Sequence, residues 1–260
     1  MSEITTDDGC RIFYRWDGPE GAPVLMLGNP IGTDHTLWDP VLPLLKGKVR
    51  TLRFDTRGHG ASDSPAGDYA IERLGRDALA LINALQLVRV AYCGVSLGGM
   101  IGQWLAGSVP TRIVHFIPVC TTAYYGDPTP WAQRIATVQK EGMAAILPGL
   151  PGRWFTEGFI AKAPETVAAV QAMVGRQNPD GYSGCCAAIR DMDLRPLLGH
   201  IKARTSVIVG DADPATPPAM GEAIAAAIPD ARLTVLKTSH FAHVEVPDAL
   251  ATAILAALEA

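Results

Sequence analysis

The sequence predicts an α/β fold, with a mostly parallel central sheet, helices on both of its faces and an inserted helical cap. Short apolar, β-branched runs alternate with segments of helical periodicity, which is the pattern of βαβ units. The run at 23–27 is continuously apolar, as expected for a strand buried on both faces of a parallel sheet. After a strand at 113–119 this alternation stops for roughly seventy residues, far longer than an ordinary loop. A helical insertion is therefore expected there.

The first part of the chain supplies four strands of the expected sheet. Residues 10–16 alternate like one strand of a hairpin, and 23–27 and 49–55 are two further strands. A helix at 71–87 precedes the short strand at 88–93. The apolar face of this helix consists of Leu74, Ala78, Leu81, Ile82 and Leu85.

A helix at 97–106 and the strand at 113–119 lead into the expected cap, residues 122–196. Three segments of the cap have helical character, at 131–138, 164–174 and 182–189. Four prolines interrupt the cap, namely Pro148, Pro151, Pro164 and Pro179.

The sheet pattern then resumes with a strand at 205–209, a helix at 217–228, a strand at 232–236 and a closing amphipathic helix at 248–258. The expected organisation is an α/β core of residues 1–121 and 197–260 that carries the cap at 122–196.

The composition indicates one sizeable hydrophobic core, because 48% of the 260 residues are hydrophobic and 18% are charged. A formal net charge of −4 provides no basic stripe, so nucleic acid and anionic membranes are not expected partners. Residues 1–9 are polar and acidic, unlike a signal peptide. We therefore expect a cytoplasmic protein with a small-molecule substrate, and the oligomeric state stays open.

The cysteines and histidines predict neither a disulfide framework nor a metal site. The five cysteines form an odd set without CxxC spacing and are expected to be reduced thiols. His240 and His243 have the one zinc-like spacing, and no further ligand follows nearby. The sequence predicts no cofactor and no metal.

Gly94-Val95-Ser96-Leu97-Gly98 has the G-x-S-x-G pattern of a nucleophile elbow and lies between a predicted strand and a predicted helix. A sharp strand-to-helix turn of this kind exposes the serine hydroxyl, and it needs small residues where the neighbouring backbone passes closely. Ser96 is therefore the candidate nucleophile.

A serine hydroxyl needs a base, and the base needs an acid to orient it. Asp213 follows the strand at 205–209 and His240 follows the strand at 232–236, which is the chain order Ser, acid, His. Asp211 is an alternative acid and His243 an alternative base. Asp213 is favoured because an Asp-Pro turn projects its carboxylate, and His240 because the second histidine of such a pair usually makes a local hydrogen bond.

Several longer stretches resemble the α/β-hydrolase superfamily, and within it the 3-oxoadipate enol-lactonases of the β-ketoadipate pathway. The likeness spans nearly the whole chain and agrees with a triad of Ser96, Asp213 and His240. The stretches are Gly32-Thr33-Asp34 with Trp38-Asp39-Pro40, 54–62, Gly75-Arg76-Asp77, Ser96-Leu97-Gly98-Gly99-Met100, 153–156, 181–189 and 213–217.

The resemblance implies a serine hydrolase that opens a small carboxylated enol-lactone through an acyl-enzyme, without a cofactor. One loop departs from the family pattern. Pro30 falls where a backbone N–H should join that of Leu97 in the oxyanion hole, and proline has no N–H. Either the backbone of Ile31 or the side chain of Asn29 is expected to replace it.

The cap should shape specificity because it covers the mouth of the site. Trp131, Arg134 and Trp154 are its candidate substrate-binding residues, and Arg134 is the first candidate to bind a substrate carboxylate. Arg153, Arg176 and Arg190 are further cations of this region.

Two alternative functions remain at this point. One is a broader carboxylesterase, or a tailoring hydrolase that uses the altered oxyanion loop for another ester or ketone. The other is a ligand-binding protein that has lost catalysis through the change at Pro30.

Overall fold

A computed structural model describes residues 2–45 and 47–259, and within them the chain forms an eight-stranded sheet of order β1-β2-β4-β3-β5-β6-β7-β8. The six strands from β4 to β8 in this order run parallel, while β1 and β2 are antiparallel additions at one edge. The strands are β1 (Ser2–Thr5), β2 (Arg11–Asp17), β3 (Val24–Gly28), β4 (Arg50–Phe54), β5 (Val90–Val95), β6 (Ile113–Val119), β7 (Arg204–Gly210) and β8 (Arg232–Leu236).

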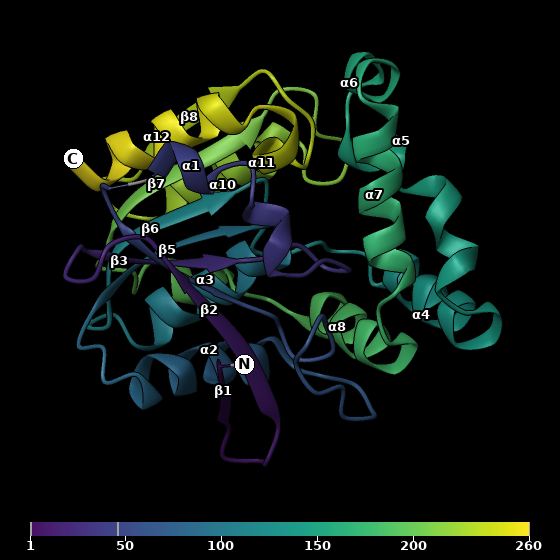
Figure 1. Ribbon diagram of the computed structural model, residues 1–260, viewed down its shortest axis with the longest axis horizontal. Helices are drawn as coiled ribbons and strands as arrows, with labels where there is room; N and C mark the ends of the chain where they lie inside the picture. Colours follow the sequence, from purple (N-terminus) through teal and green to yellow (C-terminus); the bar gives the residue numbers. More distant parts are fainter. Residues whose placement is uncertain (1, 46, 260) are drawn as a thin grey trace.

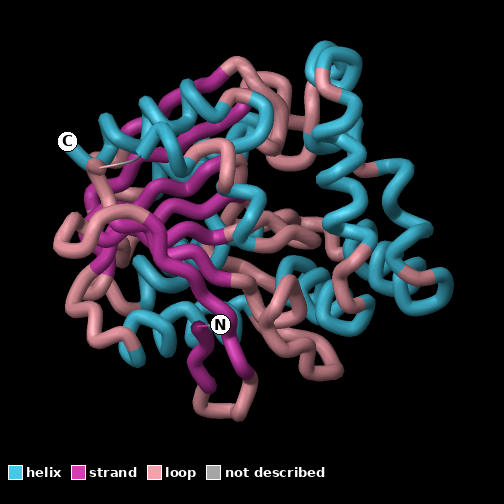
Figure 2. Tube along the Cα trace, viewed as in Figure 1, coloured by secondary structure: helices cyan, strands magenta, loops and turns pink. Residues whose placement is uncertain are grey.

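Helices cover both faces of the sheet (Figures 1 and 2). One face carries α2 (Ile71–Ala84), α3 (Leu97–Ser108), α9 (Arg195–Leu198) and α10 (Pro218–Ala227). The other face carries α1 (Leu42–Leu45), α11 (Ala242–Glu245), α12 (Pro247–Glu259) and part of the 3₁₀ turn η1 (His35–Trp38).

Side-chain alternation in the central strands divides the core between these two faces. In β3, Leu25 and Leu27 pack in the cluster beneath α12, whereas Met26 packs in the cluster beneath α3. All three side chains are fully buried, which explains why the strand has a continuously apolar sequence.

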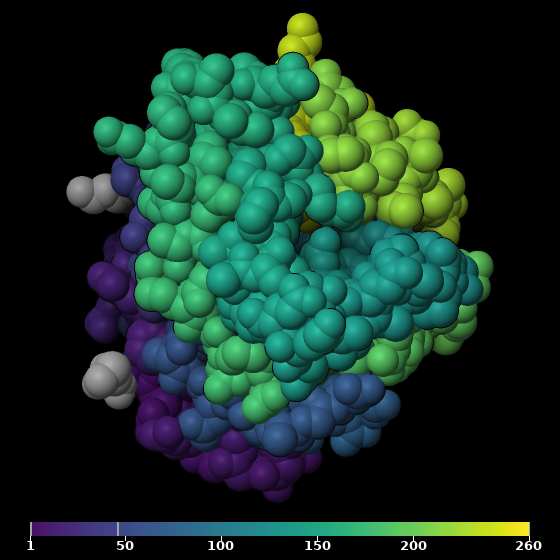
Figure 3. All heavy atoms as spheres, turned by 90° about the vertical axis from the view of Figure 1, so that its right-hand side faces the viewer, coloured from purple at the N-terminus to yellow at the C-terminus, as the bar shows by residue number. Residues whose placement is uncertain are grey.

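A helical segment connects β6 to β7, and we call residues 122–196 the cap segment. Its helices lie to the right of the sheet in Figure 1, and Figure 3 shows a hollow where they meet the C-terminal part of the chain. They are α4 (Thr129–Glu141), η2 (Met143–Gly149), α5 (Pro151–Trp154), α6 (Glu157–Lys162), α7 (Pro164–Gly175) and α8 (Pro179–Asp191). Pro151, Pro164 and Pro179 each begin a helix, where their missing N–H needs no partner.

The predicted elements are all present, with shifted ends. The helix expected at 71–87 stops at Ala84, because Gln86 takes a positive φ of 54°. β5 starts later than expected, at Val90, and runs on to Val95, since Gly94 and Val95 still pair with β6. The prediction omitted β1, a mostly exposed edge strand with no apolar periodicity.

Two further properties concern the helices and the cysteines of the described chain. None of the described helices is long and apolar enough to cross a membrane. All five cysteines are free and buried. Burial raises the pKa of Cys186 to about 12, so its thiol stays protonated at neutral pH.

A buried ion pair fixes the loop after β4 to helix α2. Arg57 Nε donates to Asp77 Oδ2 at 2.6 Å, and Nη2 donates to Oδ1 at 2.8 Å. The two side chains are only 4% and 3% exposed. Asp8, in the turn between β1 and β2, holds Arg57 Nη1 at 2.8 Å. Arg57 therefore ties the N-terminal hairpin, this loop and α2 together.

We expect Arg57→Met to lower the free energy of unfolding by about 3 kcal/mol, because it leaves the Asp77 carboxylate buried without its main partner. Arg76→Met is the matched control, since Arg76 pairs with Glu72 one turn away on the exposed surface of α2. That control should change stability by less than about 0.5 kcal/mol. Urea unfolding measures both, and equal effects would contradict a special role for the buried pair.

Candidate active site

Ser96 lies on a strained turn between β5 and α3. Its φ and ψ are 54° and −117°, a conformation that residues with a side chain rarely adopt. Two contacts hold it there: Ser96 N donates to Val119 O at 3.0 Å, and Thr121 Oγ1 donates to Ser96 O at 2.7 Å. The turn thus has the strain that the G-x-S-x-G pattern predicted.

The glycines on either side of Ser96 have no room for a side chain. A Cβ atom on Gly94 would lie 2.3 Å from the backbone of Gly98. A Cβ atom on Gly98 would lie 2.3 Å from the carbonyl carbon of Gly28, at the end of β3. The second contact places the nucleophile turn directly against the loop that follows β3.

Asp213 and His240 are hydrogen-bonded at the end of the sheet, with 2.8 Å between Asp213 Oδ2 and His240 Nδ1. Thr216 supports both, because its Oγ1 donates to Asp213 Oδ2 at 2.7 Å and lies 3.3 Å from His240 Nδ1. The backbone N–H groups of Ala215 and Thr216 donate to Asp213 Oδ1 at 2.8 and 3.0 Å.

Burial opposes ionisation of Asp213, but the charge of His240 and the hydrogen bonds from His240 and Thr216 outweigh it and lower its pKa. The carboxylate is therefore ionised at neutral pH and orients the imidazole. With Nδ1 bound to Asp213, the Nε2 atom of His240 is left to act on a substrate or on a serine hydroxyl.

The alternative acid and base have other partners. Asp211 Oδ1 accepts the backbone N–H of Thr238 at 3.1 Å and so joins the turn after β7 to the turn after β8. His243 is fully buried, its ring centroid lies 5.1 Å from that of Trp38, and neither of its nitrogens has a hydrogen-bond partner in the described chain. Asp213 pairs with His240 instead.

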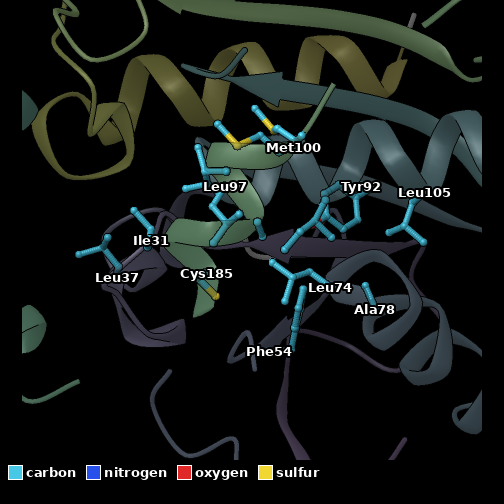
Figure 4. Close-up of a cluster of buried hydrophobic side chains, with 14 of the residues drawn as sticks. Ile31, Leu37, Phe54, Leu74, Ala78, Tyr92, Leu97, Met100, Leu105 and Cys185 are labelled. Carbon is cyan, nitrogen blue, oxygen red and sulfur yellow. The ribbon is translucent and has the colours of Figure 1, made fainter. Parts of the chain in front are cut away.

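The loop after β3 contains both candidates for the second oxyanion donor, the side chain of Asn29 and the backbone N–H of Ile31. The side chain of Asn29 is held by the β4 strand, because one of its two amide N–H groups donates to Phe54 O at 2.7 Å. The backbone N–H of Ile31 and that of Leu97 have no acceptor within residues 2–45 and 47–259. Figure 4 shows the side chains of these two buried residues at the same end of one hydrophobic cluster. The N–H of Leu97 is free because it begins helix α3, and that of Ile31 is free in a buried loop, so both can donate to an anion.

Trp154 and Thr156 of the cap segment brace the loop that carries His240. Trp154 stacks on Phe241 with 4.5 Å between ring centroids, and Phe241 N donates to Trp154 O at 3.0 Å. Thr156 Oγ1 donates to Glu245, and Glu245 Oε2 accepts the backbone N–H of Ser239 at 3.1 Å. Trp154, expected to contact substrate, thus lies beside the residue that follows His240.

Arg134 lies half-buried on helix α4 and forms no ion pair with an acid of the described chain. Its guanidinium lies over the Trp131 ring, 5.1 Å from the centroid, and Nη1 is 3.5 Å from the hydroxyl of Tyr182. Trp131 in turn contacts Tyr125, whose hydroxyl lies 3.5 Å from the carbonyl oxygen of Ala215. A chain of aromatic contacts therefore links Arg134 to the turn of Asp213.

The other cap cations are placed differently. Arg190 is bound by Asp68 and Asp191, at 2.9 and 2.6 Å, and Arg153 and Arg176 are exposed.

Sequence reasoning missed Thr216, Thr121 and Tyr125. Thr216 was part of the Asp213-Pro214-Ala215-Thr216-Pro217 stretch, where a hydroxyl three residues after the acid was an available signal. Nothing in the sequence distinguishes Thr121 or Tyr125 from other residues of their kind. No group of three or more His, Cys, Asp or Glu side chains that could hold a metal occurs in the part of the chain that the structure describes.

Comparisons with known proteins agree on one family. A model described as the alpha/beta hydrolase family matches residues 24–253. The curated 3-oxoadipate enol-lactonase 2 of Acinetobacter baylyi is 36% identical over 259 residues, covering 100% of this chain and 97% of its own. The crystal structure of a hydrolase from Pseudomonas aeruginosa PA01 superposes with a TM-score of 0.96 at 42% identity, over 100% of this chain and 98% of that one. The enol-lactonase from Burkholderia xenovorans LB400 gives a TM-score of 0.97 at 35% identity over 100% of both chains.

Two buried histidines should make the fold sensitive to acid. Burial lowers the pKa of His59 from 6.5 to about 4 and that of His243 from 6.5 to about 3. The unfolded chain therefore takes up these two protons near pH 6.5, well before the folded chain does. Stability should be complete above pH 6.5 and fall between pH 6.5 and 4, by about 1.4 kcal/mol per pH unit for each histidine.

His243→Leu should remove one of the two contributions and reduce this slope by about 1.4 kcal/mol per pH unit. The control is His200→Leu, at an exposed position, which should leave the slope as it is. Urea unfolding between pH 4 and 7 measures both, and an unchanged slope in His243→Leu would refute the assignment.

Proposed function

The chain belongs to the α/β-hydrolase family and cleaves an ester-type bond, and from this premise we propose that it is a serine hydrolase that opens 3-oxoadipate enol-lactone to 3-oxoadipate. Full-length similarity to two proteins named as enol-lactonases supports the substrate. The observation that carries the mechanism is the 2.8 Å hydrogen bond between Asp213 and His240, in a fold whose strained elbow presents Ser96.

In the first half of the reaction, His240 Nε2 takes the proton of the Ser96 hydroxyl as the oxygen attacks the lactone carbonyl. Asp213 stabilises the imidazolium that forms. Collapse of the tetrahedral intermediate breaks the ring C–O bond and expels the enolate oxygen. An enolate is a good leaving group, and it takes up at carbon the proton that His240 received from Ser96, which gives the ketone of the product and returns His240 to its neutral form.

In the second half, His240 deprotonates a water molecule that attacks the Ser96 ester. The acyl C–O bond breaks, Ser96 recovers a proton from His240, and the new carboxylic acid leaves and releases its proton to the solvent as it becomes a carboxylate. One water molecule is consumed for each lactone opened, and the residues return to their starting state without any cofactor.

The backbone N–H groups of Ile31 and Leu97 are the proposed oxyanion donors. Both are buried and neither has an internal acceptor in the described chain, whereas the Asn29 amide is engaged by Phe54. Ile31 thus supplies the donor that Pro30 cannot. Loss of one such donor typically removes about 2.7 to 4 kcal/mol of transition-state stabilisation.

Arg134 is the proposed partner of the substrate carboxylate. Its guanidinium is backed by Trp131 and Tyr182 rather than neutralised by an acid. The contacts from Trp131 through Tyr125 to Ala215 connect it to the turn that holds Asp213. A guanidinium held in this way can bind a carboxylate with two parallel hydrogen bonds.

We expect Ser96→Ala to lower kcat on 3-oxoadipate enol-lactone by at least about 10³-fold, because the nucleophile is removed. The variant should also lose labelling by a fluorophosphonate probe, while Ser108→Ala, at an exposed position at the end of α3, should keep both activity and labelling. Wild-type protein that turns over simple aryl esters but not the enol-lactone would instead favour a broader carboxylesterase. Wild-type protein that is folded and not labelled would exclude the serine mechanism.

Arg134→Met should raise KM for the carboxylated lactone by about 10- to 100-fold, the equivalent of a lost charge-assisted hydrogen bond of about 1.5 to 3 kcal/mol. Turnover of p-nitrophenyl acetate, which has no carboxylate, should stay within about threefold. Arg176→Met, at an exposed position of the cap segment, is the control and should leave both constants unchanged. Steady-state kinetics decide the matter, and an unchanged KM in Arg134→Met would refute the assignment.

A further inference from the structure

We propose that Thr33 and His59 are positioning residues of the oxyanion hole, which fix the two peptide planes on either side of Ile31 and thereby aim its N–H. This inference rests on the proposed serine hydrolase function. Neither side chain needs to touch the substrate, because each acts through the backbone of the loop after β3.

The first peptide plane joins Pro30 to Ile31. Thr33 Oγ1 donates to Pro30 O at 2.8 Å, and the Thr33 side chain is fully buried. The described chain has no cis peptide bond, so this C=O and the N–H of Ile31 point in opposite directions across the plane. Holding the carbonyl oxygen toward Thr33 therefore turns the Ile31 N–H away from Thr33 and leaves it without an internal acceptor.

The second peptide plane joins Ile31 to Gly32. Gly32 N donates to His59 Nε2 at 2.7 Å, and Gly32 has a φ of 82°, in the region that favours glycine. A Cβ atom on Gly32 would lie 3.2 Å from both Tyr182 and Val174 of the cap segment. The loop is thus fixed on one side by His59 and covered on the other by α7 and α8.

His59 can accept this bond only as a neutral imidazole protonated on Nδ1. Its Nδ1 atom faces Arg57 O at 3.4 Å and Cys185 Sγ at 3.8 Å, and the Tyr182 ring centroid lies 6.3 Å away. The charges of Asp55 and Asp34 favour a protonated ring, but complete burial outweighs them and keeps the pKa near 4. The acceptor at Nε2 is therefore present at neutral pH.

A side chain that only fills space could be replaced by another of similar size, whereas a positioning group needs its hydrogen bond. The test compares Thr33→Val, which removes the hydroxyl, with Thr33→Ser, which retains it. It likewise compares His59→Leu with His59→Gln, whose amide oxygen can accept in place of Nε2. The matched control is His115→Leu, which removes a histidine near the N-terminal end of β6, away from the carboxyl ends of the strands where the candidate site lies.

The measurements are kcat and KM for p-nitrophenyl acetate, with active sites counted by fluorophosphonate titration and folding checked by thermal unfolding. We expect Thr33→Val and His59→Leu to lower kcat by about 10- to 100-fold, part of the 10²- to 10³-fold effect of losing one oxyanion donor, with KM changed less than about threefold. Thr33→Ser, His59→Gln and His115→Leu should stay within about threefold of wild type.

A second measurement does not depend on activity. The ¹⁵N shifts of the His59 ring should identify the tautomer protonated on Nδ1, and the Gly32 amide proton should be protected from exchange. His59→Leu should lose this protection while His59→Gln keeps it. If His59→Leu does not fold, the Thr33 pair alone carries the kinetic test.

Different results would overturn the positioning role and the serine mechanism. Normal kcat in a folded Thr33→Val enzyme, or no rescue by Thr33→Ser and His59→Gln, overturns the positioning role and leaves the serine mechanism intact. Absence of both labelling and esterase activity in the wild type overturns the proposed function itself, and the positioning role with it.

Discussion

The backbones of Gly28 and Gly98 approach each other so closely that a Cβ atom on Gly98 would lie 2.3 Å from the carbonyl carbon of Gly28, and a Cβ atom on Gly28 would meet the Tyr92 hydroxyl at 2.3 Å and the Cα atom of Gly98 at 3.0 Å. This contact joins the end of β3 to the turn that holds Ser96, and the two parallel strands on either side of it pair in register up to Gly28 and Gly94. A side chain at either glycine would push the loop of Ile31 away from Ser96. The candidate active site therefore depends first on the lack of side chains at these two glycines, and only then on the groups that perform chemistry.

Around this contact, the sheet collects residues that are far apart in the chain. β5, β7 and β8 are parallel, so their carboxyl ends meet at one edge and bring Ser96, Asp213 and His240 to the same place. Small polar side chains supply supporting bonds at two of these positions. Thr121 donates to the backbone carbonyl of Ser96, and Thr216 donates to the carboxylate of Asp213.

The sequence was informative where a physical requirement leaves few choices of residue. The strained elbow requires small neighbours, so Gly94, Ser96 and Gly98 were recognisable, and buried parallel strands require continuous apolar runs. β1 was not recognisable, because an exposed edge strand needs no apolar face.

The candidate site could be predicted only in part for a similar reason. Two acids and two histidines fitted the expected order, and the structure distinguishes them through contacts with Thr238 and Trp38 that no local pattern encodes. The partner of His59 is a backbone N–H 27 residues earlier, and a backbone group has no signature in a sequence.

The contacts of Trp154 and Thr156 have a consequence for engineering. Both belong to the cap segment, yet they hold the loop of His240 through Phe241 and Glu245. A chimaera that exchanged the whole insertion for that of another hydrolase would bring in a new binding surface and at the same time remove these braces. Exchanging the insertion would therefore change reactivity together with specificity. A working chimaera would have to keep residues 154–156 of this chain.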